Sequence, residues 1–444
     1  MPEIARRVSE HPRIAYLTAG AAGMFCGSCM RDNAMASALT RMGVDIQLIP
    51  TYTPIRTDEE NVAIDRVFFG GLNVYLQDRF PIFRRMPRWF DWLLDRPWLI
   101  HWLASRGMET SARELGSLTI SMLEGSAGPV AKEVRRLVGY LKDELKPEVV
   151  GLTNILIGGC IPTIKRELGC PVVVTLQGDD LFLLDLIEPF RSEAIDRIRR
   201  IGQEVDVFVT FSNYYADFMA DLLKLDRSRF RIVPLGIQAS DFGIGRTTAD
   251  RPPTIGYFAR ICPAKGFDRV VNAWLAIRQM PGLERTHLIA AGWLGGGDQA
   301  YFDEQVQRID DAGLTADFDY WGVVDRSQKR EFFQQIDLLS VPTTYREPKG
   351  LFVLEALASG VPVVQPAHGA FPEMLASTGG GVLVSPDDPE ELARVIGSLL
   401  KDRKRATELG REGREGVLRS HTIEKSANDY LQAVASCLPS AKSG

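Results

Sequence analysis

The chain has 444 residues, of which 45% are hydrophobic and 25% charged, and a formal net charge of −5. This length and composition predict a globular protein with two domains, and the negative charge argues against a nucleic-acid partner. The first residues lack the apolar stretch of a secretory signal, no run of about eighteen apolar residues occurs, and the cysteines are scattered, so we expect a cytoplasmic protein with reduced thiols.

Short apolar, β-branched runs alternate with helical patterns in the first half of the chain. The runs that predict buried parallel strands are 13–20, 44–50, 147–154, 171–178 and 206–212. Helices are expected between them, at Asn33–Arg41, Ile161–Leu168 and Ser192–Ile201. Strands that alternate with helices are typical of an α/β protein with a doubly wound sheet.

The same rhythm restarts in the second half, after a segment rich in Gly, Asp, Thr and Pro at 237–253 that reads as a linker. The expected strands are 254–260, 287–292, 318–322, 337–343, 362–367 and 381–386. We therefore predict two doubly wound, Rossmann-like domains that face each other across a cleft. The first spans 1–242 and the second 243–420, and residues 421–444 include a helix that crosses back to the first domain.

Two acidic residues bracket the start of an apolar helix in "EPKGLFVLEALASG". Glu347 precedes this helix, and Glu355 lies inside it among apolar neighbours. A solvated helix face is the ordinary explanation for a Glu, but a carboxylate in this setting needs a ligand or a cation. Gly350 allows close approach of the backbone, and the amides of Leu351 and Phe352 at the helix N-terminus favour an anion.

Two cations follow the first strand of the second domain, in "YFARICPAKGFDRV". Arg260 and Lys265 lie beside a helix N-terminus, which is a suitable seat for a diphosphate. An isolated pair of this kind would more often be ordinary surface charge. The segment matches neither the Walker loop nor the dinucleotide-binding glycine pattern.

Taken together, Glu347 and Glu355 in "EPKGLFVLEALASGVPVV", with "ARICPAKGFD", "GLTADFDYWGVV" and "HGAFPEML" in this order, resemble the retaining glycosyltransferases of family 4, which have the GT-B fold. The segment "SNYYADFMADLLKLDRSRFRIVPLGI" is similar to the end of that family's first domain. The resemblance covers the second domain almost throughout and is looser over residues 1–176.

The resemblance implies a role for each matching position in a hexosyltransferase. Arg260 and Lys265 would bind the diphosphate of a nucleotide-sugar donor and stabilise its charge as it leaves, and Glu347 would position the sugar. Glu355 would hydrogen-bond the ribose, while Gly350, Leu351 and Phe352 would hold the sugar or its phosphate. The base would lie near Val323. The family needs neither a cofactor nor a metal for this chemistry.

The first domain would bind the acceptor, and here the sequence departs from the family pattern. The loop "TAGAAGMFCGSCMRDN" keeps a glycine-rich turn, and Gly23 is expected to approach the donor. Cys26 and Cys29 in this loop form a lone CxxC, which would suit zinc or redox chemistry only with further ligands, so we favour a structural role. Many relatives have a His that touches the sugar where this chain has Gln177, followed by Asp179.

An insertion at about 79–106 combines tryptophans with arginines. It would either touch an anionic membrane or lipid-linked acceptor, or pack on the first domain with its arginines solvated, and we favour the packed arrangement. The expected partners are thus a nucleotide sugar and a carbohydrate, lipid-linked or small-molecule acceptor, with peripheral membrane contact left open. The alternative functions are a GT-B sugar-nucleotide epimerase or phosphorylase, or a non-catalytic nucleotide-sugar binding protein. The tryptophans and arginines concerned are Trp89, Trp92, Trp98, Trp102, Arg84, Arg85 and Arg88.

Overall fold

The structure is a computed structural model that describes residues 11–20, 27–55, 57, 59–69, 112–243 and 251–438. The insertion expected at 79–106, together with Gly23 and Cys26, lies outside these residues. The chain divides into two units, and each is described by itself. The first comprises Met1–Val233 with Ser426–Gly444, and the second comprises Pro234–Lys425.

The boundary between the units thus falls at 233/234, whereas the sequence predicted it at 242/243. The residues after Val233 join the second unit through specific contacts. Ile237 forms a parallel bridge with Thr422, and the carbonyl of Phe242 accepts a hydrogen bond of 2.6 Å from Arg414. The linker-like composition of 237–253 therefore did not mark the residue at which the chain passes from the first unit to the second.

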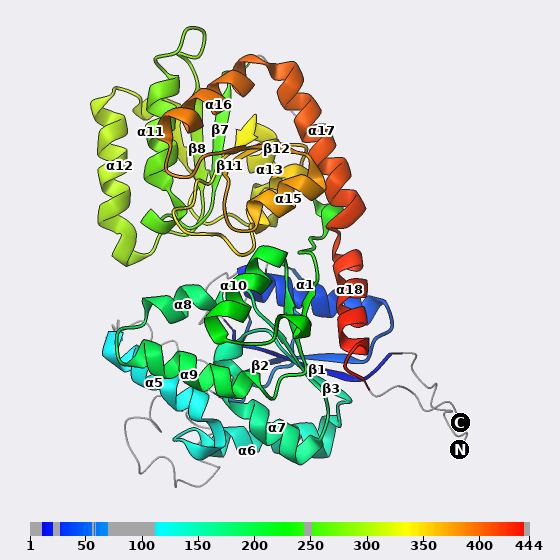
Figure 1. Cartoon of the computed structure of the whole chain (residues 1–444). Helices are drawn as coiled ribbons and strands as arrows, with labels where there is room; N and C mark the ends of the chain where they lie inside the picture. The colour runs from blue at the N-terminus through cyan, green and yellow to red at the C-terminus, as the bar shows by residue number, and fades with distance from the viewer. Residues whose placement is uncertain are drawn as a thin grey trace. The chain divides into compact units, whose positions relative to one another are not determined.

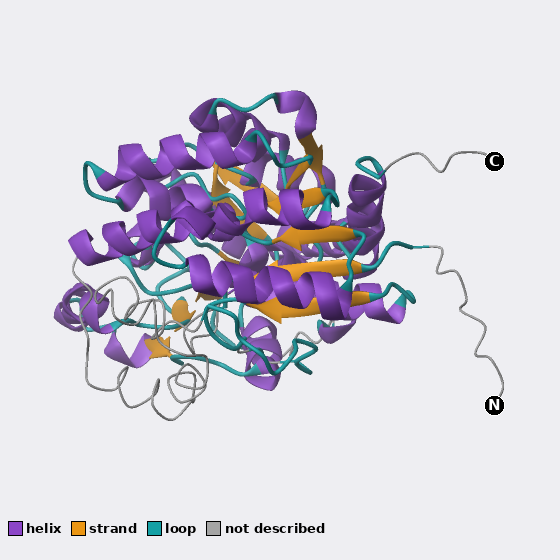
Figure 2. Ribbon diagram, turned by 90° about the horizontal axis from the view of Figure 1, so that it is seen from below, coloured by secondary structure: helices purple, strands orange, loops and turns teal. Residues whose placement is uncertain are grey.

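The first unit is built on a six-stranded parallel sheet with the order β2-β1-β3-β4-β5-β6. Figure 2 shows helices on both sides of these strands. Every residue of β1, β3, β4 and β5 is buried, as expected for a sheet covered on both faces. The strands are β1 Ile14–Thr18, β2 Ile46–Pro50, β3 Val149–Leu152, β4 Val172–Thr175, β5 Val207–Thr210 and β6 Phe230–Ile232.

The helices of the first unit include the C-terminal helix of the chain, α18. Tyr430 of this helix packs edge-on against Tyr16 of β1, with ring centroids 5.7 Å apart. The helix expected at Asn33–Arg41 begins earlier, at Gly27. The helices are α1 Gly27–Arg41, α5 Ala112–Glu124, α6 Ala131–Tyr140, α7 Ile161–Leu168, α8 Asp179–Asp185, α9 Phe190–Gly202, α10 Asn213–Leu223 and α18 Ile423–Ala435.

The second unit has its own six-stranded parallel sheet, with the order β12-β11-β10-β7-β8-β9. Counted from its first strand, this is the Rossmann order 3-2-1-4-5-6. Each strand that the sequence predicted is present, and the prediction of two Rossmann-like domains is confirmed. The strands are β7 Thr254–Phe258, β8 His287–Ala291, β9 Phe318–Tyr320, β10 Leu338–Leu339, β11 Val363–Pro366 and β12 Gly381–Val384.

Helices also flank the sheet of the second unit (Figure 1). Several begin at side-chain caps that the sequence supplies, such as Asp325, which accepts the amides of Ser327 and Gln328 in a capping box. The helices are α11 Phe267–Ile277, α12 Gln299–Asp311, α13 Arg326–Gln335, α14 Leu351–Ala358, α15 Phe371–Thr378, α16 Pro389–Lys401 and α17 Arg403–Ser420.

Candidate functional site

The strand order of the second unit reverses between its adjacent strands β7 and β10. In open α/β sheets, ligands bind at the carboxyl ends of the strands beside such a switch point. The loop after β7 carries Arg260 and Lys265, and the loop after β10 carries Glu347. The topology therefore brings the predicted cations and the first predicted acid to the edge of the sheet where a ligand is expected.

The loop after β7 is held in place by a buried tyrosine. The hydroxyl of Tyr257 donates to the carbonyls of Arg260 (3.0 Å) and Lys265 (3.4 Å). Gly266 ends this loop with φ +69°, and a Cβ there would lie 2.1 Å from the carbonyl oxygen of Pro342. Glycine thus lets the loop approach the chain that leaves β10.

The loop after β10 is attached to the loop after β7 by a backbone hydrogen bond of 3.0 Å, from the amide of Thr344 to the carbonyl of Ala264. The chain after β11 fixes the other side of Glu347. The amide of Ala370 donates to the Glu347 carbonyl at 2.8 Å. Gly369 has φ +61°, and a Cβ there would lie 2.5 Å from the same oxygen. The backbone of Glu347 is therefore held between two neighbouring loops.

The carboxylate of Glu347 is buried, and both of its oxygens have partners. Lys265 Nζ lies 2.6 Å from Oε2, and the Tyr345 hydroxyl donates to the same oxygen at 2.6 Å. The amides of Lys349 and Gly350 donate to Oε1 at 3.2 and 3.3 Å. Burial alone would raise the pKa of Glu347, but the Lys265 ammonium and these bonds lower it to about 2. Glu347 is thus ionised at neutral pH.

Lys265 lies among aromatic rings as well as beside the acid. Its Nζ is 5.1 Å from the ring centroid of Tyr345 and 5.4 Å from that of Phe352, distances at which a cation is attracted to a ring. The sequence prediction missed Tyr345, although it stands two residues before Glu347. A tyrosine next to the acidic motif was the signal that could have identified it.

Helix α14 begins at Leu351, and the residue before it, the N-cap Gly350, has φ +73°. An L side chain rarely adopts this conformation, so the glycine allows the sharp entry into the helix. The Gly350 amide donates to Glu347, so it supports the acid. The first amides of a helix have no partner within the helix. The predicted anion site therefore rests on the amides of Leu351 and Phe352.

Glu355 is 9% exposed within α14, and its partner is a cation from α13. Lys329 Nζ donates to Glu355 Oε1 at 3.0 Å and lies 5.8 Å from the ring centroid of Phe258. The sequence predicted that this carboxylate has a ligand or a cation beside it, and Lys329 is that cation. A role for Glu355 towards ribose remains a prediction.

The other predicted donor positions are open to solvent. The side chain of Val323 is 50% exposed, just after β9, and Arg260 is exposed in the loop after β7. The strands β7, β8 and β9 are neighbours in the sheet, so Arg260 and Val323 stand at the same edge.

In the first unit, Gln177 lies in the loop after β4 and Asp179 is the first residue of α8, and both are buried. Gln177 Nε2 donates to the carbonyl of Thr153 (2.8 Å) and to Asp32 (3.2 Å). Asp179 accepts the amides of Ile155 (2.9 Å) and Gln177 (2.8 Å), and burial raises its pKa to about 6. Both side chains hold neighbouring loops together, and their predicted contact with a sugar remains a prediction.

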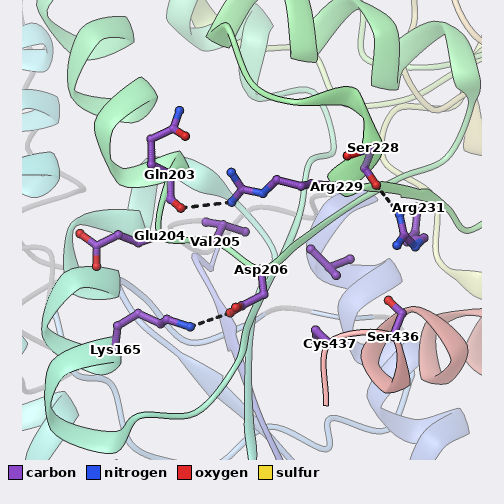
Figure 3. Close-up of a pocket in the computed structure, with 11 residues that line it drawn as sticks. Lys165, Gln203, Glu204, Val205, Asp206, Ser228, Arg229, Arg231, Ser436 and Cys437 are labelled. Carbon is purple, nitrogen blue, oxygen red and sulfur yellow. Dashed lines mark hydrogen bonds and ion pairs between the residues drawn. The ribbon is translucent and has the colours of Figure 1, made fainter. Parts of the chain in front are cut away.

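A separate cavity of about 550 Å³ lies in the first unit, at the amino ends of β5 and β6 (Figure 3). Three cations line it, and each has a structural partner; that of Arg231 is the Ser228 carbonyl, at 2.7 Å. Lys165 pairs with Asp206 at 2.8 Å, and Arg229 donates to the Gly202 carbonyl at the end of α9 at 2.7 Å. The cavity is at the opposite edge of its sheet from Gln177 and Asp179, which follow β4.

None of the helices described is long and apolar enough to cross a membrane. Likewise, His, Cys, Asp and Glu side chains form no group of three or more suited to a metal ion within the described part of the chain.

Comparison with known proteins supports the resemblance found in the sequence. Residues 245–416 match the family model of glycosyl transferases group 1. The D-inositol 3-phosphate glycosyltransferase of Mycolicibacterium smegmatis is 28% identical over 53% of this chain and 55% of its own length. The GDP-mannose-dependent alpha-(1-6)-phosphatidylinositol monomannoside mannosyltransferase of Mycobacterium tuberculosis is 27% identical over 53% of this chain and 64% of its own. The chain spans about half the length of the first curated relatives it matches.

Solved structures with low sequence identity share the fold. A sucrose-phosphate synthase from Thermosynechococcus elongatus has a TM-score of 0.69 and 17% identity, over 96% of this chain and 98% of that one. HepE of Anabaena, solved with UDP and glucose, has a TM-score of 0.65 and 14% identity, over 96% of this chain and 100% of that one. The predicted resemblance to GT-B glycosyltransferases is confirmed.

Proposed function

Because residues 245–416 match glycosyl transferases group 1, we propose that this chain is a retaining hexosyltransferase. It transfers a sugar from a nucleoside diphosphate sugar to an acceptor hydroxyl. The observation that carries the proposal is the ionised, buried Glu347 paired with Lys265 at 2.6 Å beside the switch point of the sheet.

Lys265 and Arg260 are the groups that receive the diphosphate. Negative charge develops on the leaving diphosphate as the glycosidic bond breaks, and preorganised cations stabilise it without reorganisation. These cations take the part that a metal ion plays in other transferases, so we propose that transfer is independent of metal. The acid keeps Lys265 oriented, and the nearby aromatic rings of Tyr345 and Phe352 attract its ammonium.

Glu347 is suited to electrostatic positioning more than to nucleophilic attack. Each of its oxygens already accepts hydrogen bonds, and a pKa of about 2 makes it a weak base. We propose that the acceptor attacks from the face that the diphosphate leaves, so that the anomeric configuration is retained, and that the departing phosphate takes the acceptor's proton. The fixed, negatively charged carboxylate of Glu347 then stabilises positive charge on the sugar.

The relatives suggest a class of acceptor. Their names include an inositol phosphate and a phosphatidylinositol mannoside, so we propose a polyol or lipid-linked glycan with a phosphate group. A cytoplasmic enzyme that contacts the membrane peripherally would meet either kind of acceptor.

Donor binding is tested first, by thermal stabilisation with UDP, GDP and ADP and their sugars in the absence of metal. We expect a selective increase in Tm with one base, which Glu355→Ala abolishes, while Lys265→Ala reduces turnover. Lys404→Ala, which removes an exposed lysine of α17, serves as the matched control and should bind and turn over normally. Wild-type activity in both Glu355→Ala and Lys265→Ala would disprove the assignment of the site.

The nature of the reaction is tested by NMR of the product. Retention of the anomeric configuration is expected, and an inverted product would refute the proposed mechanism. Donor binding without any transfer to a panel of phosphorylated and lipid-linked polyols would favour the alternative of a non-catalytic binding protein.

A further inference from the structure

The loop after β8 exposes a tryptophan that none of the site motifs includes. The Trp293 side chain is 41% exposed. Its indole lies against the backbone of Gly295, because a Cβ at that glycine would be 2.8 Å from the indole Cη2. A larger residue there would displace the ring. Glycine thus leaves room for the distal end of the indole, and the exposed area leaves surface for another planar group.

Backbone hydrogen bonds fix the position of Trp293 between two predicted donor-binding loops. The amide of Ile261 donates to the Trp293 carbonyl at 2.9 Å, so the residue adjoins the loop of Arg260. The amide of Gly292 donates to the Gly322 carbonyl at 2.8 Å, next to the exposed Val323. A Cβ at Gly292 would lie 1.9 Å from the carbonyl oxygen of Ala259, so glycine is required for this close approach.

The strands arrange these residues in the order in which a nucleotide sugar is built. Glu347 follows β10, Arg260 and Lys265 follow β7, Trp293 follows β8 and Val323 follows β9, and these strands are consecutive in the sheet. A donor has its sugar at one end, its diphosphate in the middle and its nucleoside at the other end. With the sugar at Glu347 and the diphosphate at the cations, the nucleoside extends towards Trp293.

We propose that Trp293 is a stacking platform for the base of the nucleotide donor. This inference rests on the proposed function and adds a residue that the family motifs do not contain. A purine or pyrimidine presents a flat aromatic face, and stacking against an indole does not depend on the identity of the base. Trp293 therefore contributes affinity for the nucleoside, and the backbone near Val323 is left to select among bases.

The test compares a nucleoside diphosphate with inorganic pyrophosphate as ligands in calorimetric titrations of the full chain. Trp293→Ala is expected to weaken binding of the preferred nucleoside diphosphate by about 5- to 150-fold, the range for loss of one base–aromatic stack. Binding of pyrophosphate, which has no base, should stay unchanged. Trp293→Phe should retain part of the affinity, because it keeps an aromatic face. Leu418→Ala, which truncates another exposed apolar side chain of the second unit, is the matched control and should bind as wild type.

Three outcomes would overturn the proposal, and they are distinguishable. Unchanged nucleotide affinity in Trp293→Ala removes the platform but leaves the proposed function intact. An equal loss of affinity for nucleotide and pyrophosphate means that Trp293 only supports the phosphate-binding loop. A wild-type chain that binds no nucleoside diphosphate refutes the proposed function, and the platform with it.

Discussion

Acidification should destabilise the second unit through Glu347. The pKa of this buried carboxyl is about 2 in the folded chain, compared with an ordinary value of 4.5. Because folding lowers the pKa, the ionised group stabilises the folded state fully above about pH 4.5, and this stabilisation is lost as the pH falls towards 2. The difference corresponds to about 3 kcal/mol at neutral pH, of which about 1 kcal/mol is lost by about pH 3.5.

The assay measures the free energy of unfolding in urea at neutral and acidic pH, followed by hydrogen exchange of the α14 amides. Wild type is compared with Glu347→Gln, in which no carboxyl remains to titrate, and with Glu390→Gln, which changes an exposed carboxylate of α16. The advantage of wild type over Glu347→Gln should shrink by about 1 kcal/mol between neutral pH and about pH 3.5. Parallel pH profiles for wild type and Glu347→Gln would refute the argument that Lys265 holds the carboxyl ionised.

Three further substitutions test other parts of the structure, each by urea unfolding. Lys329→Met leaves the carboxylate of Glu355 without its cation and should destabilise the second unit by about 3 kcal/mol, and the double variant Lys329→Met, Glu355→Leu should recover most of this loss. Recovery by less than half would argue against the buried ion pair. Gly369→Ala places a Cβ 2.5 Å from the Glu347 carbonyl oxygen, so we expect a loss of at least about 2 kcal/mol, and wild-type stability would contradict this packing. Tyr430→Phe removes a buried hydroxyl that has no partner among the described residues and should stabilise the first unit by about 1 kcal/mol; a loss of stability would show that the hydroxyl is bonded.

Much of the fold follows from local patterns of residues. The buried strands are short, apolar and β-branched, and turns or helices separate them, so their positions could be predicted. Strand β6 was missed because it has only three residues and includes Arg231, which is exposed. Its strand conformation comes from pairing with β5, which is a tertiary effect that local propensity does not report.

The candidate site was predictable where its residues are close in sequence. Glu347 and Gly350 belong to one motif, and topology then brings Lys265 to the acid across a sequence separation of 82 residues. Lys329 could not be assigned to Glu355, because it lies in a polar helix where a lysine on a solvated face is the usual case. The roles of Gln177 and Asp179 could not be predicted for a different reason. The sequence alone does not distinguish a polar residue that holds loops together from one that faces a ligand.

The hydrogen bonds of the Tyr257 hydroxyl suggest how the loop after β7 tolerates substitutions. The hydroxyl binds the carbonyls of Arg260 and Lys265, not their side chains. The ends of the loop are therefore anchored whatever residues occupy the accessible positions 263 and 264, whereas Ile261 and Cys262 are buried in the core. Libraries that vary these two positions while keeping Tyr257 would alter the surroundings of the proposed donor without moving the attachment points of the two cations. The loop is thus a natural place to begin redirecting the proposed transferase towards a new donor.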